Sequence, residues 1–384
     1  MYNNISIGGI NLKDFVKNNT DLMFDTLKDL CYIPAPSHHE EKRAEYCKEW
    51  LEKVGAKGVY VDEALNVIFP INCENSSQIT VFAAHTDTVF PDMEPMPYFD
   101  DGEKIYCPGV SDDTTSVVVL MTMAKYFIEN NLLPENGIMF VCNSCEEGLG
   151  NLKGTRQLFK DYAGRIKQFV SFDSIFGFIN SRCVGSHRYE VEVRTEGGHS
   201  FGKFGNKNAI AELSKIISEI YKIDVPVKEG AKTTYNVGEI SGGTSVNTIA
   251  QSARMLCEYR SDDFECLEYM KNRFDEIFRN AANDKVDVKV TLVGDRPCGT
   301  ATDEMIKPLI DTVKPILEEV TGEEIKCKSA STDCNIPLSL GVPAICIGVN
   351  NHFGVHTREE WVEKASIPVG LEIAIRFGKK LLEV

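Results

Sequence analysis

The stretch Ile138-Met139-Phe140-Val141-Cys142-Asn143-Ser144-Cys145-Glu146-Glu147-Gly148 decides the fold class. An apolar run of strand length gives way there to two adjacent carboxylates and a glycine. In an open α/β sheet, ligands bind outside the carboxyl ends of the strands. Two acidic groups at such an end repel each other unless a positive charge, such as a metal ion, lies beside them. A solvated loop pair is the simpler interpretation of Glu146 and Glu147 alone, so the other strand ends decide between the two.

Two further predicted strands end in groups that bind metals. The buried run Ile79–Ala84 is followed by His85-Thr86-Asp87. His85 is a candidate ligand through one ring nitrogen, and Asp87 could hold the other nitrogen. The strand predicted over 168–173 has Asp173 as its last residue. Repetition of the pattern favours a shared site over a set of unrelated surface groups.

Asp112 and Asp113 come just before an apolar stretch of helical length. Carboxylates are favourable at a helix N-terminus because of the helix dipole. Asp113 or Thr114 could serve as the N-cap residue, which leaves Asp112 free to point elsewhere.

Two histidines follow the last predicted strand, 343–348. His356 is a candidate ligand and is followed by Thr357, while His352 is closer to the strand end and competes with it. Both alternatives stay open at this stage. Near the N-terminus, Ser37 and Glu40 match a capping box and predict a second helix beginning there.

Length and hydrophobic patterning predict two domains. A chain of 384 residues exceeds the size at which one hydrophobic core stops growing. Near Val184 the pattern changes to alternating strands, and a β-α-β-β-α-β order follows, which is typical of a ferredoxin-like unit. We therefore predict an α/β catalytic domain made of residues 1–183 and 296–384, with residues 184–295 inserted as an α+β domain.

Composition excludes several partners. The net charge of −16 argues against a nucleic-acid partner, which needs clustered Lys and Arg. No apolar run approaches the ~20 residues that a membrane-spanning helix needs. Thirteen scattered cysteines without a signal peptide predict a cytoplasmic protein with reduced thiols.

Mixed histidine and carboxylate ligands suit zinc, cobalt or manganese. The candidates are His85, Asp112, Glu146, Glu147, Asp173 and His356. If one of the two glutamates is a base rather than a ligand, five ligands remain, which is more than one tetrahedral zinc ion needs. Two ions that share one carboxylate and a water would use all five and leave one glutamate as general base.

Four ordered blocks resemble the signature of the M20 metallopeptidase family: His85-Thr86-Asp87, 109–113, Glu146-Glu147-Gly148 and His356-Thr357. The resemblance covers essentially the whole chain. It implies a mixed-sheet, zinc-exopeptidase-like catalytic domain with an inserted lid domain, through which two subunits would form a homodimer. It also implies that His85, Asp112 and Asp173 bind one metal, and that Asp112, Glu147 and His356 bind the other. By the same resemblance Glu146 is the general base, Asp87 orients His85, and a cis peptide joins Asp112 to Asp113.

The resemblance extends to three residues of the inserted domain. His199 matches a lid histidine that polarises the scissile carbonyl, and it could act within its own chain or in the partner's site. Asn247 and Arg260 resemble residues that grip a substrate carboxylate; an arginine pairs with such a group through two parallel hydrogen bonds. The loop Ser329–Asp333 departs from the family pattern because it lacks the usual glycines.

These observations predict a two-zinc exopeptidase of the peptidase T type that hydrolyses small peptides, as an aminopeptidase or a di- or tripeptidase. An N-acyl amino acid amidohydrolase with the same metal chemistry is the first alternative. A catalytically silent sensor of amino acids or peptides is the second.

Overall fold

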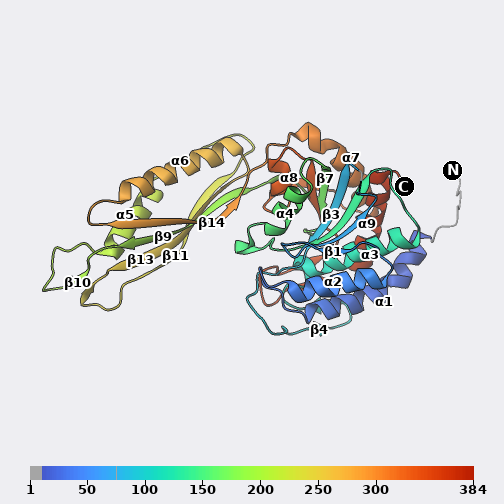
Figure 1. Cartoon of the computed structure of the whole chain (residues 1–384), viewed down its shortest axis with the longest axis horizontal. Coiled ribbons are helices and arrows are strands. Elements are labelled where there is room, and N and C mark those ends of the chain that lie inside the picture. The colour runs from blue at the N-terminus through green and yellow to red at the C-terminus, as the bar shows by residue number, and fades with distance from the viewer. Residues whose placement is uncertain (1–10, 75) are drawn as a thin grey trace. The chain divides into compact units, whose positions relative to one another are not determined.

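The computed structural model describes residues 11–74 and 76–384 and divides into two compact units (Figure 1). Unit 1 consists of the residues up to Arg182 together with Ala301–Val384. Unit 2 is the intervening segment Cys183–Thr300, compared with the predicted insertion of 184–295.

Unit 1 is built on a mixed sheet of eight strands in the order β1-β2-β6-β3-β7-β16-β8-β15. The strands are β1 (Tyr60–Val61), β2 (Val67–Ile71), β3 (Ile79–His85), β6 (Gly137–Asn143), β7 (Ile166–Ser171), β8 (Phe178–Cys183), β15 (Lys326–Ala330) and β16 (Ala344–Ile347). The central strands β6, β3, β7 and β16 run parallel to one another, while β2 and β8 pair antiparallel at either side. The predicted α/β fold with a mixed sheet is confirmed.

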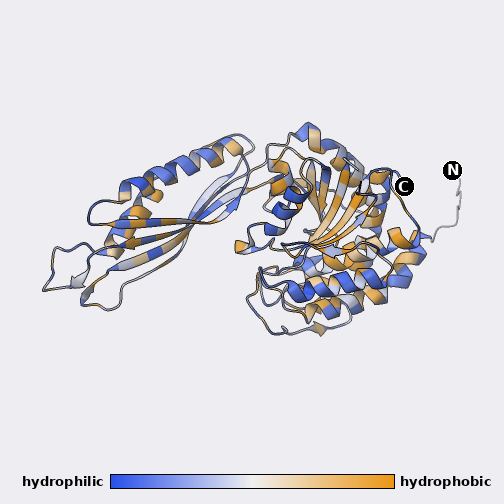
Figure 2. Ribbon diagram, in the orientation of Figure 1, coloured by the Kyte–Doolittle hydropathy of each residue, from blue (hydrophilic) through white to orange (hydrophobic). Residues whose placement is uncertain are grey.

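The parallel strands have a simple sequence cause. Every residue of β3 and β6 is buried, and both strands are apolar along most of their length (Figure 2). Near-continuous apolar strands are typical of a parallel sheet that is covered on both faces. Phe127 of α3 (Thr115–Glu129) packs edge-on against Phe140 of the sheet, and Phe377 of α9 (Ser366–Leu382) packs against Phe82. On the opposite face, α4 (Lys153–Asp161) contributes the contact of Phe159 with Phe169 of β7.

The other helices of unit 1 are α1 (Leu12–Cys31), α2 (Glu41–Lys53), α7 (Asp303–Thr321) and α8 (Asn335–Ser339). The predicted capping box of α2 is wrong, because the N-cap residue is Glu40 and no side-chain hydrogen bond caps the helix. Ser37 and Glu40 instead bind distant loops.

A second, small sheet of unit 1 has the order β17-β18-β5-β4. Its strands are β4 (Phe99–Asp100), β5 (Lys104–Tyr106), β17 (His352–Phe353) and β18 (Trp361–Glu363). The antiparallel pairing of Trp361 with Tyr106 brings the C-terminal part of the chain beside the segment that leads to Asp112.

Unit 2 contains a four-stranded antiparallel sheet in the order β11-β13-β9-β14. Its elements are β9 (Gly185–Arg194), β10 (Gly198–His199), α5 (Ala209–Ile220), β11 (Thr233–Gly242), β12 (Thr248–Ile249), β13 (Ser252–Ser261), α6 (Phe264–Ala281) and β14 (Asp287–Arg296). The buried side chains of the two helices and of alternate residues of β9 and β13 form one hydrophobic core. Both helices therefore cover one face of this sheet.

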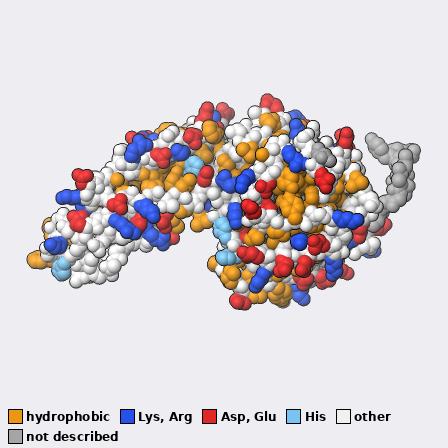
Figure 3. All heavy atoms as spheres, viewed as in Figure 1, with side chains coloured by type: hydrophobic (Ala, Val, Ile, Leu, Met, Phe, Trp, Pro, Cys, Tyr) orange, Lys and Arg blue, Asp and Glu red, His pale blue; other side chains and the backbone are white. Residues whose placement is uncertain are grey.

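Among the described residues, no helix combines the length and the apolar character that crossing a membrane requires. Acidic and basic side chains are interspersed over the visible surface (Figure 3). All thirteen cysteines are free thiols in the structure.

Candidate active site

The parallel strands bring their carboxyl ends, and the residues just beyond them, to one edge of the sheet. His85 is the last residue of β3, and Glu146 and Glu147 follow β6. Asp173 lies two residues beyond the end of β7, which stops at Ser171 rather than at Asp173 as predicted. Chain segments far apart in sequence therefore meet where α/β proteins bind ligands.

Asp112 enters the site from an irregular turn. The turn, η1 (Val110–Thr114), directly precedes α3, and Gly109 before it has a φ of 77°, a left-handed conformation that favours glycine. The peptide between Asp112 and Asp113 is cis, as the resemblance implied. Of the two predicted N-cap residues of α3, Thr114 occupies the N-cap position, although its side chain makes no capping hydrogen bond, and Asp113 Oδ2 instead accepts a hydrogen bond from the His85 backbone N–H at 3.0 Å.

Three groups of side chains have potential ligand atoms within 4.8 Å of one another in the described part of the chain, and all three lie in unit 1. They are His85, Asp112 and Asp173; Asp112, Glu147 and His356; and His85, Glu146 and Glu147. The first two groups share Asp112.

The two oxygens of Asp112 face two different histidines. Asp112 Oδ1 lies 3.0 Å from His85 Nε2, and Asp112 Oδ2 lies 3.0 Å from His356 Nε2. His356 Nε2 is also 3.2 Å from Glu147 Oε1. His352 belongs to none of these groups, and its Nδ1 is bound to Asn350 Oδ1 at 2.7 Å, so it is His356 rather than His352 that contacts Asp112. A carboxylate between two histidines has the arrangement of a bridging ligand.

Burial and mutual repulsion disturb the acidic groups. Burial, together with the charge of Asp112, raises the pKa of Glu147 to about 8 and raises the pKa of Asp173 well above its usual value. Contact with the carboxylates of Asp112 and Glu147 raises the pKa of His356 to about 10. Burial opposes ionisation of Asp112, but its bonds to His356 and His85 outweigh that effect and hold its pKa far below normal. Protons thus balance part of the negative charge in the metal-free site.

The donor set fits divalent cations. Imidazole nitrogens and carboxylate oxygens are ligands that zinc, manganese and cobalt accept. Glu147 Oε1 is buried and faces His356 Nε2 at 3.2 Å, a contact that lacks the geometry of a hydrogen bond. A buried acceptor of this kind calls for an explanation, and a cation at this position would supply one.

Asp87 links two of the strand ends. His85 Nδ1 lies 3.1 Å from the Asp87 backbone carbonyl and 3.3 Å from Asp87 Oδ1, so the second ring nitrogen of His85 faces Asp87. The backbone N–H groups of Glu146 and Glu147 donate to its two oxygens at 2.9 and 3.0 Å. The bonds from His85 and Ser37 overcome the effect of burial and lower the pKa of Asp87. Asp87 is therefore an ionised carboxylate that fixes His85 and both glutamates together.

Ser37 and Glu40, predicted to form a capping box, support the site instead. Ser37 donates its hydroxyl to Asp87 Oδ2 at 2.6 Å. Glu40 Oε1 accepts from the backbone N–H of Cys145 at 3.0 Å and from its thiol at 3.2 Å. Both contacts join residues about fifty or more positions apart, so a local sequence signature could not reveal them.

The predicted substrate residues of unit 2 do not form one cluster. His199 and Asn247 are exposed and lie close together, because β10 pairs with β12 and Ser200 N donates to the Asn247 carbonyl at 2.9 Å. Arg260 lies at the other end of β13, eight residues from Ser252, which corresponds to roughly 26 Å of extended strand. Its guanidinium already pairs with Glu258, with Nε donating to Oε1 at 2.8 Å and Nη2 to Oε2 at 3.1 Å.

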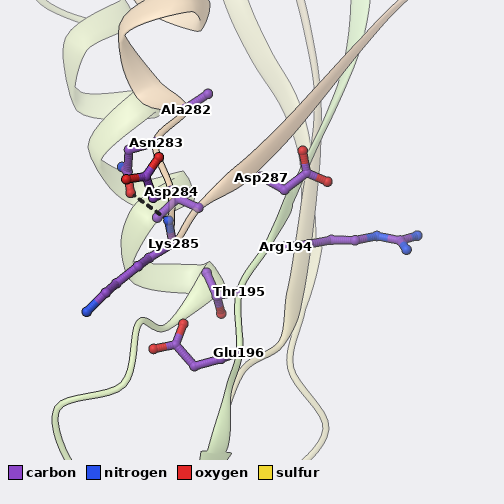
Figure 4. A pocket seen from close by; sticks show the side chains of 9 residues that line it. Arg194, Thr195, Glu196, Ala282, Asn283, Asp284, Lys285 and Asp287 are labelled. Atoms are coloured by element: carbon purple, nitrogen blue, oxygen red, sulfur yellow. Dashed lines mark hydrogen bonds between the residues drawn. The ribbon is translucent and has the colours of Figure 1, made fainter.

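Unit 2 also has a hollow of about 790 Å³, lined by residues 194–196 and 282–287 (Figure 4). Its charged side chains are of mixed sign, and the Asn283 side chain accepts from the Lys285 backbone N–H at 3.1 Å. None of the candidate ligands or substrate residues lines it.

Comparison with known proteins supports the interpretation of this geometry. The sequence model of the peptidase family M20/M25/M40 matches residues 81–380. The chain is 23% identical to the succinyl-diaminopimelate desuccinylase of Corynebacterium glutamicum, over 90% of this chain and 94% of the relative. Among solved structures, a tripeptidase from Staphylococcus aureus has a TM-score of 0.74 and 20% identity, with 95% of this chain and 99% of the other covered. A dinuclear metal-binding M20 peptidase from Bacillus subtilis has a TM-score of 0.65 and 14% identity, with coverage of 96% and 99%. The chain therefore belongs to peptidase family M20/M25/M40 and is a hydrolase of that family.

Proposed function

We propose that the protein hydrolyses an amide bond in small peptides, as an aminopeptidase or a di- or tripeptidase, with two divalent metal ions. One observation carries the proposal: the oxygens of Asp112 are divided between His85 and His356, beside Glu146. His85, Asp112 and Asp173 would hold one ion, and Asp112, Glu147 and His356 the other. Zinc is the proposed ion, with cobalt and manganese accepted by the same ligands.

Bound ions would lower the pKa of an attacking water and polarise the amide carbonyl. The remaining steps belong to the chain itself. The backbone N–H of Glu146 donates to Asp87 Oδ1, which fixes the position of Glu146. The Glu146 carboxylate accepts a proton from the water as the water attacks the carbonyl carbon. Protonated Glu146 then gives this proton to the leaving amine nitrogen. His85 Nδ1 lies 3.1 Å from the Asp87 backbone carbonyl and 3.3 Å from Asp87 Oδ1, so it donates to Asp87 and leaves Nε2 as the nitrogen with a free lone pair.

We also propose that His199 and Asn247 act together on the substrate in a homodimer, and that they do so in the site of the partner. The roughly 26 Å of strand between Arg260 and the Ser252 end of β13 supports this, because one small peptide cannot span it. The test mixes Glu146→Gln with His199→Ala protein. If the residues act in trans, the mixture regains activity that neither variant has alone. A mixture that stays as inactive as its components would show that both residues serve the site of their own chain.

The likeness to a desuccinylase favours a second candidate, hydrolysis of N-acyl amino acids with the same residues. Both candidates are tested by one assay of the purified protein with added zinc. The panel contains di- and tripeptides beside N-acetyl and N-succinyl amino acids, and the control contains a chelator. We expect metal-dependent cleavage of peptides with a free amino group. Cleavage of acylated substrates alone would instead establish the amidohydrolase, and silence on every substrate with two ions bound would favour a sensor.

A further inference from the structure

Glu360 is a completely buried carboxylate just outside the proposed ligand set. It lies four residues after His356 and directly before β18. Nothing in the sequence distinguishes it from its exposed neighbour Glu359. An ionised carboxylate with no access to water is costly unless its oxygens are satisfied by hydrogen bonds.

Four hydrogen bonds satisfy the Glu360 carboxylate, and all come from the turn that presents Asp112. Oε2 accepts from the Gly109 backbone N–H at 2.7 Å. Oε1 accepts from the Ser111 N–H at 2.8 Å, from the Ser111 hydroxyl at 2.7 Å and from the Asp112 N–H at 3.0 Å. The Glu360 side chain thus holds the backbone of Asp112 itself.

The main chain around Glu360 fixes the same junction. The Cys107 N–H donates to the Glu360 carbonyl at 3.2 Å, and the next residue, Trp361, pairs with Tyr106. Glu360 therefore joins the loop that carries His356 to the turn that carries Asp112. The side chains of these two segments also meet, because His356 Nε2 lies 3.0 Å from Asp112 Oδ2.

A carboxylate is the group that this position requires. Its four partners are all donors, and an ionised carboxylate only accepts. A glutamine would be nearly the same size, but its NH₂ group cannot accept, so at least one backbone N–H would lose its partner. A buried N–H without an acceptor is unfavourable, so the backbone of the turn would move to find another partner. Such a movement would shift the Asp112 side chain.

We propose that Glu360 is a positioning residue that sets Asp112 between the two metal sites. This inference rests on the proposed function, since it gives Asp112 the role of shared ligand. Outer-shell partners of metal ligands typically change metal affinity by about 10–100-fold when they are replaced. We expect Glu360→Gln to fall in this range, and to lower kcat more than it raises KM at saturating metal.

The test is a Co²⁺ titration of full-length, chelator-treated protein, read by the visible absorption of bound cobalt. Glu359→Gln is the matched control, because it makes the same change one residue away on the surface. We expect weaker cobalt binding and an altered spectrum for Glu360→Gln, and a wild-type curve for Glu359→Gln. Thermal unfolding of the metal-free variants separates a fold defect from a positioning defect. Wild-type cobalt affinity in Glu360→Gln would overturn the inference.

Ser111→Ala provides a milder variant if Glu360→Gln does not fold. It removes one hydroxyl donor and keeps every backbone N–H, so its cobalt affinity should fall by less than that of Glu360→Gln. If Ser111→Ala is the only variant that folds, an unchanged cobalt affinity of this variant would count against the inference. Failure of the proposed function looks different: the wild-type protein itself would then bind fewer than two cobalt ions.

Discussion

The two units hold their candidate residues in opposite ways. In unit 1, His85, Asp87 and both glutamates are buried and linked by hydrogen bonds from several chain segments. In unit 2, His199 and Asn247 are exposed, and their side chains accept hydrogen bonds from residues two or three positions away. Groups that must hold ions in a fixed geometry need such support, whereas groups that meet a substrate need access to it. The difference supports the proposal that unit 1 holds the metal ions and that the exposed residues of unit 2 contact the substrate.

The largest expected effect is that of Glu146→Gln in unit 1. General acid–base catalysis contributes about 10²–10⁴-fold, so kcat should fall by that factor. Metal content should stay at two ions per chain, because Glu146 is not among the proposed ligands of either ion. The measurement is steady-state hydrolysis together with elemental analysis, and Glu135→Gln on the exposed surface is the control. If the variant had a kcat near that of the wild type at full metal occupancy, Glu146 would not be the general base.

The matching variant in unit 2 is His199→Ala. Loss of one group that stabilises the developing oxyanion typically costs about 10²–10³-fold in kcat. Metal affinity should not change, since His199 lies outside the ligand groups. Lys203→Ala, a neighbouring exposed position, is the control. A loss of bound metal in His199→Ala would contradict the division between the units.

Asp87→Asn tests the support of the metal site itself. The amide keeps the shape of the side chain but loses the charge, and one of its two terminal atoms can no longer accept. We expect about a 10–100-fold loss of metal affinity, as is typical when the partner of a ligating histidine is replaced. Competition with a chromogenic chelator measures it. Wild-type affinity would show that the hydrogen bonds of Asp87 are structural only.

The last prediction concerns pH rather than a substitution. In the metal-free protein the pKa of Glu147 is raised to about 8 and that of His356 to about 10, so both carry a proton at pH 7. A metal ion must displace these protons, so affinity should rise with pH between 6 and 8 by up to about tenfold per unit for each proton released. Calorimetry in buffers of different ionisation enthalpy counts the protons. Binding without proton release would show that these two residues are not ligands.

The strand ends could be predicted because their pattern is local. An apolar run followed by His85 or by Glu146-Glu147 indicates both a buried strand and the polar groups at its carboxyl end, and parallel strands then place these ends at one edge. The mixed α/β sheet is predicted by the same runs.

The supporting residues could not be predicted because their partners are remote. Ser37 and Glu40 match a capping box, yet the tertiary structure directs Ser37 to Asp87 and Glu40 to Cys145. Glu360 resembles Glu359 in sequence, and only the pairing of β18 with β5 brings it beneath the Asp112 turn. Local signatures predict local bonds, and they fail where a distant donor or acceptor competes for the same group.

The central claim is that Asp112 lies between two metal ions, and anomalous diffraction from zinc-soaked crystals tests it most directly. We predict two peaks, one near His85, Asp112 and Asp173 and one near Asp112, Glu147 and His356, about 3.5–4 Å apart as in other two-metal sites. A single peak, or a pair of peaks that does not include Asp112, would contradict the account.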